Sequence, residues 1–153
     1  DYAKHLSNTA KVPHAWDFFH DQVGWNDRMP NINAAIGCSQ LEKLNHKLKL
    51  KRILHSNFVQ SFKDVKDAEI IKEAEDCQSN YWLITLRLKG KNIENLRNNI
   101  LKEAHKLKIY IRPSWILLNE LPMYKNCNCG DLTEAKSQSK RLLNLPSSPQ
   151  LIK

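Results

Sequence analysis

Glycine, cysteine and long apolar runs are scarce in this 153-residue sequence, and each scarcity excludes a class of protein. The four glycines are not clustered, so the chain has no glycine-rich loop for nucleotide phosphates. No apolar run approaches the roughly eighteen residues that span a bilayer; the longest lie at 81–86 and 115–118. The first residues have neither the charged start nor the apolar centre of a secretory signal. We therefore expect a chain that does not act in a membrane.

The cysteines are few and irregularly spaced, at Cys38, Cys77, Cys127 and Cys129. This pattern argues against the disulfide framework of a small secreted domain and favours the reducing cytoplasm. Cys127 and Cys129 form a C-x-C pair, whereas zinc sites use longer gaps and a second ligand pair nearby. We expect no metal site, and we expect Cys38 to be a small buried hydrophobe on a helix.

The net charge of +8 raises the question of nucleic acid, because residues 43–52 hold five basic residues and no acid. Lys43, Lys47 and Lys51 have the spacing of one helix face, with leucines between them, as in a solvated helix face. The stretch has no interleaved aromatic residues to stack on bases. We predict no nucleic-acid partner and keep a basic binding module as the alternative function.

The histidines are scattered and no motif pairs them with a serine or cysteine nucleophile. We expect His46 and His55 to lie exposed on a helix. The residues therefore predict no catalytic unit in this chain, and a non-catalytic structural domain is a further alternative.

The first thirty residues are predicted to be irregular, because Pro13, Gly24 and Pro30 interrupt them. They carry a dense group of aromatic side chains: Trp16, Phe18, Phe19 and Trp25. Such a segment needs another surface to cover it.

After this segment, Asn33 is predicted to cap a long helix from Ala34 to about residue 62. Residues 63–78 are charged and lack a clear period. The alternation in residues 79–88 then predicts a strand that ends at Gly90, with Tyr81 in the strand and a common face. That face comprises Trp82, Ile84, Leu86 and Leu88.

The remaining pattern predicts a helix capped by Asn92, a short strand at 108–112 stopped by Pro113, and a helix behind an Asp131–Glu134 capping box. A last strand is predicted at 142–145. The apolar positions of the first of these helices have three- and four-residue spacing: Ile93, Leu96, Ile100, Ala104 and Leu107. The fold class is therefore α+β, with a long helix and a small, mainly antiparallel sheet covered by helices on one face.

Five segments together resemble the carboxy-terminal part of the DegT/DnrJ family of pyridoxal-phosphate-dependent nucleotide-sugar aminotransferases. In chain order they are HDQVGWNDRMPNINAAIGCSQLEKL, SNYWLITL, IYIRPSW, ELPMY and LNLPSS. The most specific is the G-x-N-x-R-M motif at Gly24–Met29. The R-P-x-W form at Arg112–Trp115 and the N-L-P-S-S ending are similar to the branch that aminates UDP-linked 4-keto-6-deoxy N-acetylamino sugars.

The resemblance implies the small carboxy-terminal domain of a type I aminotransferase fold, formed by residues 34–153. Residues 1–33 would belong to, or pack on, the large domain and the dimer partner. The lysine that forms the Schiff base with pyridoxal 5'-phosphate would fall upstream of Asp1, so this chain has no catalytic residue and is expected to be inactive alone. The lysines present lie in polar contexts, where we expect none to have a lowered pKa.

The whole enzyme would be a cytoplasmic homodimer, with glutamate as donor and a 4-keto nucleotide sugar as acceptor for polysaccharide or glycan biosynthesis. By position in the motif, Asn26 matches the residue that donates to the cofactor phosphate of the other subunit. Arg28 suits the substrate diphosphate or that phosphate. Its alternative is an ion pair with Asp21 or Asp27.

Arg112 and Trp115 are the predicted binding residues for the sugar nucleotide, because they offer a cation and a flat apolar face. The alternative is that Trp115 fills the core and Arg112 pairs with an acid. The small residue at Gly24 suits a tight turn and a close approach to a helix. Tyr81 and Trp82 are assigned to the core strand as structural residues.

Overall fold

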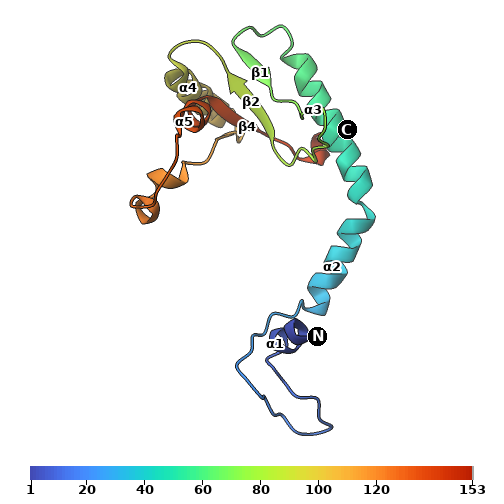
Figure 1. Cartoon of the computed structure of the whole chain (residues 1–153). Helices are drawn as coiled ribbons and strands as arrows, with labels where there is room; N and C mark the ends of the chain where they lie inside the picture. Colours follow the sequence, from blue (N-terminus) through green and yellow to red (C-terminus); the bar gives the residue numbers. More distant parts are fainter. Residues whose placement is uncertain (153) are drawn as a thin grey trace. The chain divides into compact units, whose positions relative to one another are not determined.

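The computed structural model describes residues 1–152 and divides into two compact units, Asp1–Leu44 and Asn45–Lys153 (Figure 1). The predicted boundary lies earlier, between residues 33 and 34.

The first unit begins with the helix α1 (Tyr2–Ser7), so the prediction of irregular structure is wrong for these residues. The chain then turns back, and the Trp25 amide donates to the carbonyl of Leu6 (2.8 Å). Isolated antiparallel bridges join Asn8 to Asn26 and Lys11 to His20. Backbone hydrogen bonds therefore hold a segment whose sequence shows no period.

The helix α2 (Asn31–Glu42) starts before the predicted residue, Ala34. Pro30 precedes it with φ −59° and ψ 146°, and no side chain caps the helix, so Asn33 lies inside it. A proline in extended conformation does not hinder a helix that starts directly after it, because the first helical amides lack intrahelical partners anyway.

A break at Lys43 separates α2 from α3 (Leu44–Ser61), where one continuous helix was predicted. The Lys43 amide donates to the carbonyls of Gln40 and Leu41, a tightening of the last turn that is common at helix ends. Of the predicted solvated basic face, Lys43 is exposed at the break, whereas Lys47 and Lys51 on α3 are only partly exposed.

The second unit contains a four-stranded antiparallel sheet with the order β1-β2-β4-β3. Its strands are β1 (Ala68–Ile70), β2 (Ile84–Leu88), β3 (Arg112–Pro113) and β4 (Leu142–Leu145). The prediction for β4 is confirmed, and β1 was missed because three residues are too few to show a period. Pro113 does not stop β3 but lies in it; β3 is an edge strand, where a missing amide is tolerated.

The core lies on the face formed by alternate residues of β2: Ile84, Leu86 and Leu88 are buried together with Leu143 of β4. Apolar side chains from α3 and from α4 (Ile93–Lys106) pack against this core. The opposite face is polar: Thr85 Oγ1 donates to Asn144 Oδ1 (3.0 Å). This arrangement agrees with the predicted α+β sheet covered by helices on one face.

Two predicted strand residues behave differently. Trp82 lies outside β2 and is 68% exposed, so its assignment to the core strand is wrong. Tyr81 is buried, but its φ of 45° places it in the left-handed region rather than in a strand. The chain therefore makes a turn directly before β2.

The helix boundaries near the carboxy end follow the prediction more closely than the caps do. Asn92 precedes α4 but is left-handed (φ 53°) and makes no side-chain cap bond. Leu107, predicted on the apolar face, follows α4 and is exposed. Before α5 (Thr133–Arg141), Asp131 Oδ1 accepts bonds from the Thr133 amide (2.9 Å) and hydroxyl (2.7 Å), which lowers the pKa of Asp131.

Two further expectations are wrong. Cys38 is exposed rather than buried, and all four cysteines are free thiols. His55 is 7% exposed, because it lies under the loop before β2. Within residues 1–152, no helix is long and apolar enough to cross a membrane, and no cluster of three or more metal-ligating side chains is present.

Candidate functional site

A cavity of about 980 Å³ opens in the second unit, where the loops flanking β2 and β4 meet. Because Ile84 pairs with Leu145, the first residue of β2 lies beside the last residue of β4, at the same end of these two strands. Arg112 of β3 pairs in register with Asn144, and both line the cavity. The antiparallel pairing thus collects residues from three distant segments.

Arg112 and Trp115 lie in this one cavity, as expected if they share a ligand. Arg112 is exposed, and no residue in the range 1–152 forms a hydrogen bond or ion pair with its guanidinium. Trp115 is 69% exposed and therefore does not fill the core. The structure thus places an unpaired cation and an exposed aromatic side chain in the same cavity.

Sequence reasoning missed a second indole that lines the cavity, that of Trp82. The ring centroids of Trp82 and Trp115 are 6.4 Å apart with an interplanar angle of 34°. The period-two pattern assigns Trp82 to the core, so no signal in the sequence indicates this role.

The loop with Asn26 and Arg28 lies in the first unit and is fixed on α1 by its backbone. The Asp27 amide donates to the carbonyl of Ser7 (3.0 Å). At Gly24, an added Cβ would lie 2.5 Å from the Ala10 nitrogen. Glycine is therefore required at the place where the loop approaches the backbone, as predicted.

The side chains of Asn26 and Arg28 are exposed and have no partner among the residues that the structure describes. Asp21, one alternative partner of Arg28, instead forms a 2.7 Å contact with His5 Nε2. Asp27 forms no ion pair with Arg28 within residues 1–152. An unpaired amide and an unpaired guanidinium are donors that fit a phosphate group.

Lys51 is an exception to the expectation for the lysines, because partial burial lowers its pKa. Its Nζ donates to the carbonyl of Ser147 (2.6 Å), directly after β4. Ser147 Oγ in turn donates to the carbonyl of Trp82 (2.6 Å). Lys51 therefore supports the edge of the cavity.

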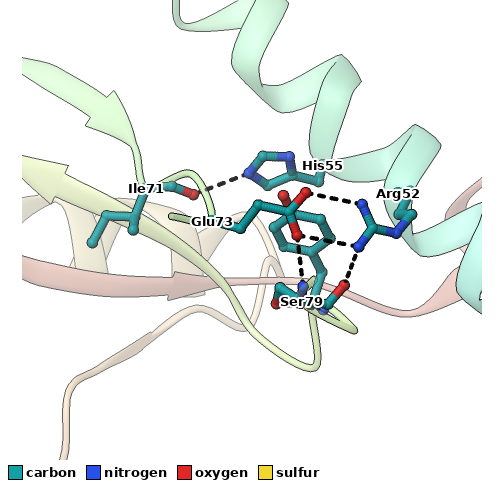
Figure 2. Close-up of polar contacts among 6 residues, drawn as sticks. Arg52, His55, Ile71, Glu73 and Ser79 are labelled. Carbon is teal, nitrogen blue, oxygen red and sulfur yellow. Dashed lines mark hydrogen bonds and ion pairs between the residues drawn. The ribbon is translucent and has the colours of Figure 1, made fainter. Parts of the chain in front are cut away.

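A polar network links α3 to the loop of residues 71–79, as Figure 2 shows. This loop leads to Trp82, which lines the cavity. Arg52 Nη1 and Nη2 donate to the two carboxylate oxygens of Glu73 (3.0 and 3.1 Å), and Nη2 also donates to the carbonyl of Ser79 (2.7 Å). The Ser79 amide donates to Glu73 Oε2 (2.6 Å). These bonds, that of Arg52 first, lower the pKa of Glu73 to about 2.

His55 lies on the same face of α3 as Arg52, because the two residues are three positions apart. Its ring stacks on Tyr81 with centroids 3.9 Å apart and an interplanar angle of 14°. His55 Nε2 donates to the carbonyl of Ile71 (3.0 Å). That spacing on α3 was the one available sequence signal for the network.

Comparison with known proteins agrees with the resemblance seen in the motifs. The DegT/DnrJ/EryC1/StrS aminotransferase family matches this chain over residues 1–153. The chain belongs to this family of aminotransferases. The family is pyridoxal-phosphate-dependent, and a Streptococcus pneumoniae protein solved in its PLP form is similar in fold (TM-score 0.79, 22% identity, 95% of this chain and 37% of that chain).

Other relatives also match with most of this chain. The GDP-perosamine synthase of Escherichia coli O157:H7 is 32% identical over 135 residues, which cover 88% of this chain and 35% of that protein. The Helicobacter pylori aminotransferase PseC, involved in pseudoaminic acid biosynthesis, has a TM-score of 0.84 and 19% identity, over 97% of this chain and 40% of that chain. This chain thus spans about a third of the length of the curated relative that it matches.

Proposed function

We propose that this chain is the carboxy-terminal part of an enzyme that transfers an amino group, with glutamate as donor, to a 4-keto nucleotide sugar. The observation that supports this most is the cavity that joins the unpaired guanidinium of Arg112 to the face of Trp115. A guanidinium can bind two oxygens of a diphosphate at once, and a sugar or base offers a flat face to an aromatic ring.

Residues of the two units have different roles in this proposal. Asn26 donates to the phosphate of pyridoxal 5'-phosphate, in the family manner across a homodimer, through a neutral amide. Arg28 binds the substrate, through its diphosphate, or the neighbouring cofactor phosphate. Arg112 orients the substrate diphosphate, and Trp115 excludes water from one side of it. When bound, the cofactor supplies the electron sink for moving the amino group.

Apart from Asn26 and Arg28, residues 1–33 have a structural role, in which their aromatic side chains pack on the large domain and the dimer partner. Residues 34–153 form the small domain. The lysine that binds the cofactor lies outside this chain in the proposal. Residues 1–153 alone are therefore expected to be inactive. The whole enzyme acts in the cytoplasm in the biosynthesis of surface polysaccharide or glycan.

The nucleotide of the substrate has two candidates. The R-P-x-W form at Arg112–Trp115 and the N-L-P-S-S ending favour a UDP-linked N-acetylamino sugar. The 32% identity to a GDP-perosamine synthase favours a GDP-linked sugar.

The test is an assay of the full-length protein with pyridoxal phosphate, glutamate and either a UDP- or a GDP-linked 4-keto-6-deoxy sugar, read by mass spectrometry of the amino sugar. One of the two substrates is expected to be aminated. Arg112→Ala should raise its KM about tenfold or more, because a charged hydrogen bond of about 1.5–3 kcal/mol is lost. Asn26→Ala should weaken cofactor binding instead.

Two results would contradict the proposal. The first is no amination of either sugar by the wild-type protein that has bound the cofactor. The second is an unchanged KM in Arg112→Ala. Transfer of the amino group by residues 1–153 alone would contradict the placement of the lysine outside them.

A further inference from the structure

Tyr81 and Trp82 are neighbours in sequence with opposite environments. Tyr81 is 8% exposed and Trp82 is 68% exposed. Tyr81 has a φ of 45°, a conformation that bulky side chains rarely adopt and that persists only where surrounding contacts enforce it. The turn that directs Trp82 outward is thus held by its surroundings.

The Tyr81 amide donates to Ser79 Oγ (3.0 Å), and the ring of Tyr81 is contacted by side chains of α3. The ring of His55 stacks on it, and the guanidinium carbon of Arg52 lies 5.4 Å from its centroid. Glu73 and the carbonyl of Ser79 fix that guanidinium in turn (Figure 2). Arg52 and Glu73 therefore act on Trp82 through the buried tyrosine.

The backbone of Trp82 is fixed on both sides, whereas its indole is exposed. The Trp82 amide donates to Asn80 Oδ1 (2.9 Å), and its carbonyl accepts from Ser147 Oγ (2.6 Å). The indole lines the cavity and has Trp115 as its aromatic neighbour. A large apolar side chain thus stands in the cavity on a rigid backbone.

The spacing of the two indoles decides how they meet a ligand. Carbon atoms in contact lie about 3.5–4 Å apart, so a ring inserted between two indoles needs about 7–8 Å between their centroids. The observed 6.4 Å is too short for insertion. Trp82 and Trp115 therefore form one continuous apolar wall rather than two jaws, and the donors Arg112 and Asn144 line the same cavity.

We propose that Trp82 is a specificity-determining residue of the nucleotide-sugar site, where one flat ring face of the ligand lies on the Trp82–Trp115 wall. Arg52 and Glu73 are positioning residues that hold Trp82 in place. This inference rests on the proposed function and deepens it, since it adds a contact in the same cavity.

The first experiment is calorimetric titration of the full-length, cofactor-loaded protein with UDP, GDP, UDP-N-acetylglucosamine and GDP-mannose. Trp82→Ala should weaken binding of the preferred ligand about tenfold, the low end of what removal of a stacking ring costs. Trp82→Phe keeps a flat face and should restore most of the affinity. Tyr124→Ala removes an aromatic ring that does not line this cavity and serves as the matched control.

The four ligands distinguish two sources of the ring. If UDP or GDP loses as much affinity as its sugar conjugate, the base lies on the wall. If only the sugar conjugates lose affinity, the hexose lies there. Equal affinity of Trp82→Ala and wild type for a ligand that the wild type binds overturns the inference and leaves the proposed function intact; a wild type that binds none of the four overturns both.

The second experiment separates positioning from general stability. Glu73→Gln should weaken the same ligand about threefold and raise KM without lowering kcat, because it loosens the wall and touches no reacting atom. In the Trp82→Ala background the same change should have no further effect, since residues that act through one another are not additive. An undiminished loss in that background would show that Glu73 does not act through Trp82.

Discussion

Residues 1–44 and 45–153 differ in how they treat apolar side chains. The second unit buries its own core around Ile84, Leu86 and Leu143, whereas Ala10 is the buried apolar residue of the first unit. The first unit exposes most of its large apolar side chains: Tyr2, Trp16, Phe18, Phe19, Val23, Trp25, Met29, Ile32, Ile36, Leu41 and Leu44. The second unit is stabilised by its own core. The exposed apolar side chains of the first unit indicate that another surface covers them.

The two regions also differ in what fixes their candidate binding residues. Backbone hydrogen bonds and one glycine fix the loop of Asn26 and Arg28. Side-chain stacking and ion pairs of α3 fix the cavity loop around Trp82. Substitutions that remove one kind of support should therefore affect one region and spare the other.

The largest expected effect is on the core of the second unit. Leu143 is fully buried on a central strand, so Leu143→Ala should lower the free energy of unfolding by about 3 kcal/mol, through lost burial and a cavity. Urea unfolding of residues 1–153 measures this loss. Leu107→Ala is the control: this leucine is 72% exposed, and its change should stay within about 0.5 kcal/mol. Similar losses for both would mean that the described core is wrong.

The next effect concerns the first unit, where a Gly→Ala substitution should lower the free energy of unfolding at one glycine and raise it at another. Gly24→Ala places a Cβ 2.5 Å from the Ala10 nitrogen, so backbone must shift, at a cost of about 1–3 kcal/mol. Gly37→Ala lies inside α2 with no atom within 4 Å of the new Cβ, and should stabilise the helix by about 1 kcal/mol.

Hydrogen exchange resolves this pair. In Gly24→Ala the amides of Thr9, Trp25 and Asp27 should exchange faster, because each donates a backbone bond in the folded loop. Amides of β2 and β4 should not change. Equal exchange in Gly24→Ala and wild type would show that the loop does not need this close approach.

The local hydrophobic pattern predicted those elements whose residues alternate between the core and the polar face of the sheet. The alternation of Ile84, Leu86 and Leu88 predicted β2, and the leucines at 142–145 predicted β4 with the bounds that the structure has. β1 has only three residues, so its strand character depends on pairing with β2 and not on its own period. The break at Lys43 was not predicted, because the helical spacing of apolar residues continues through it in the sequence.

The candidate site divides in the same way. A motif found Arg112 and Trp115, and the cavity joins them. Trp82 was assigned to the core because it continues the alternation of Ile84, and the left-handed turn at Tyr81 breaks that phase. The turn depends on Arg52 and Glu73, which are 21 residues apart in sequence, a distance that no local pattern covers.

The smallest expected effect tests that long-range pair through pH. The hydrogen bonds of Arg52 first, and of the Ser79 amide next, lower the pKa of Glu73 to about 2 from an ordinary value of 4.5. Because the folded pKa is the lower one, the pair stabilises the second unit fully above about pH 4.5, and this contribution is lost as the pH falls toward 2. Glu73→Gln should therefore unfold in less urea than the wild type at pH 7, and the difference should shrink steadily between those two pH values.

Glu103→Gln is the matched control, because Glu103 pairs with Lys106 on the exposed surface of α4, where such pairs contribute little to stability. It should unfold at pH 7 almost as the wild type does. A Glu73→Gln difference that stays constant down to pH 2.5 would show that the carboxylate is not the group that holds the loop. In that case the stacking of His55 on Tyr81 and the bond from the Tyr81 amide to Ser79 Oγ would have to account for the turn, and the aromatic wall would depend on packing and local bonding rather than on charge.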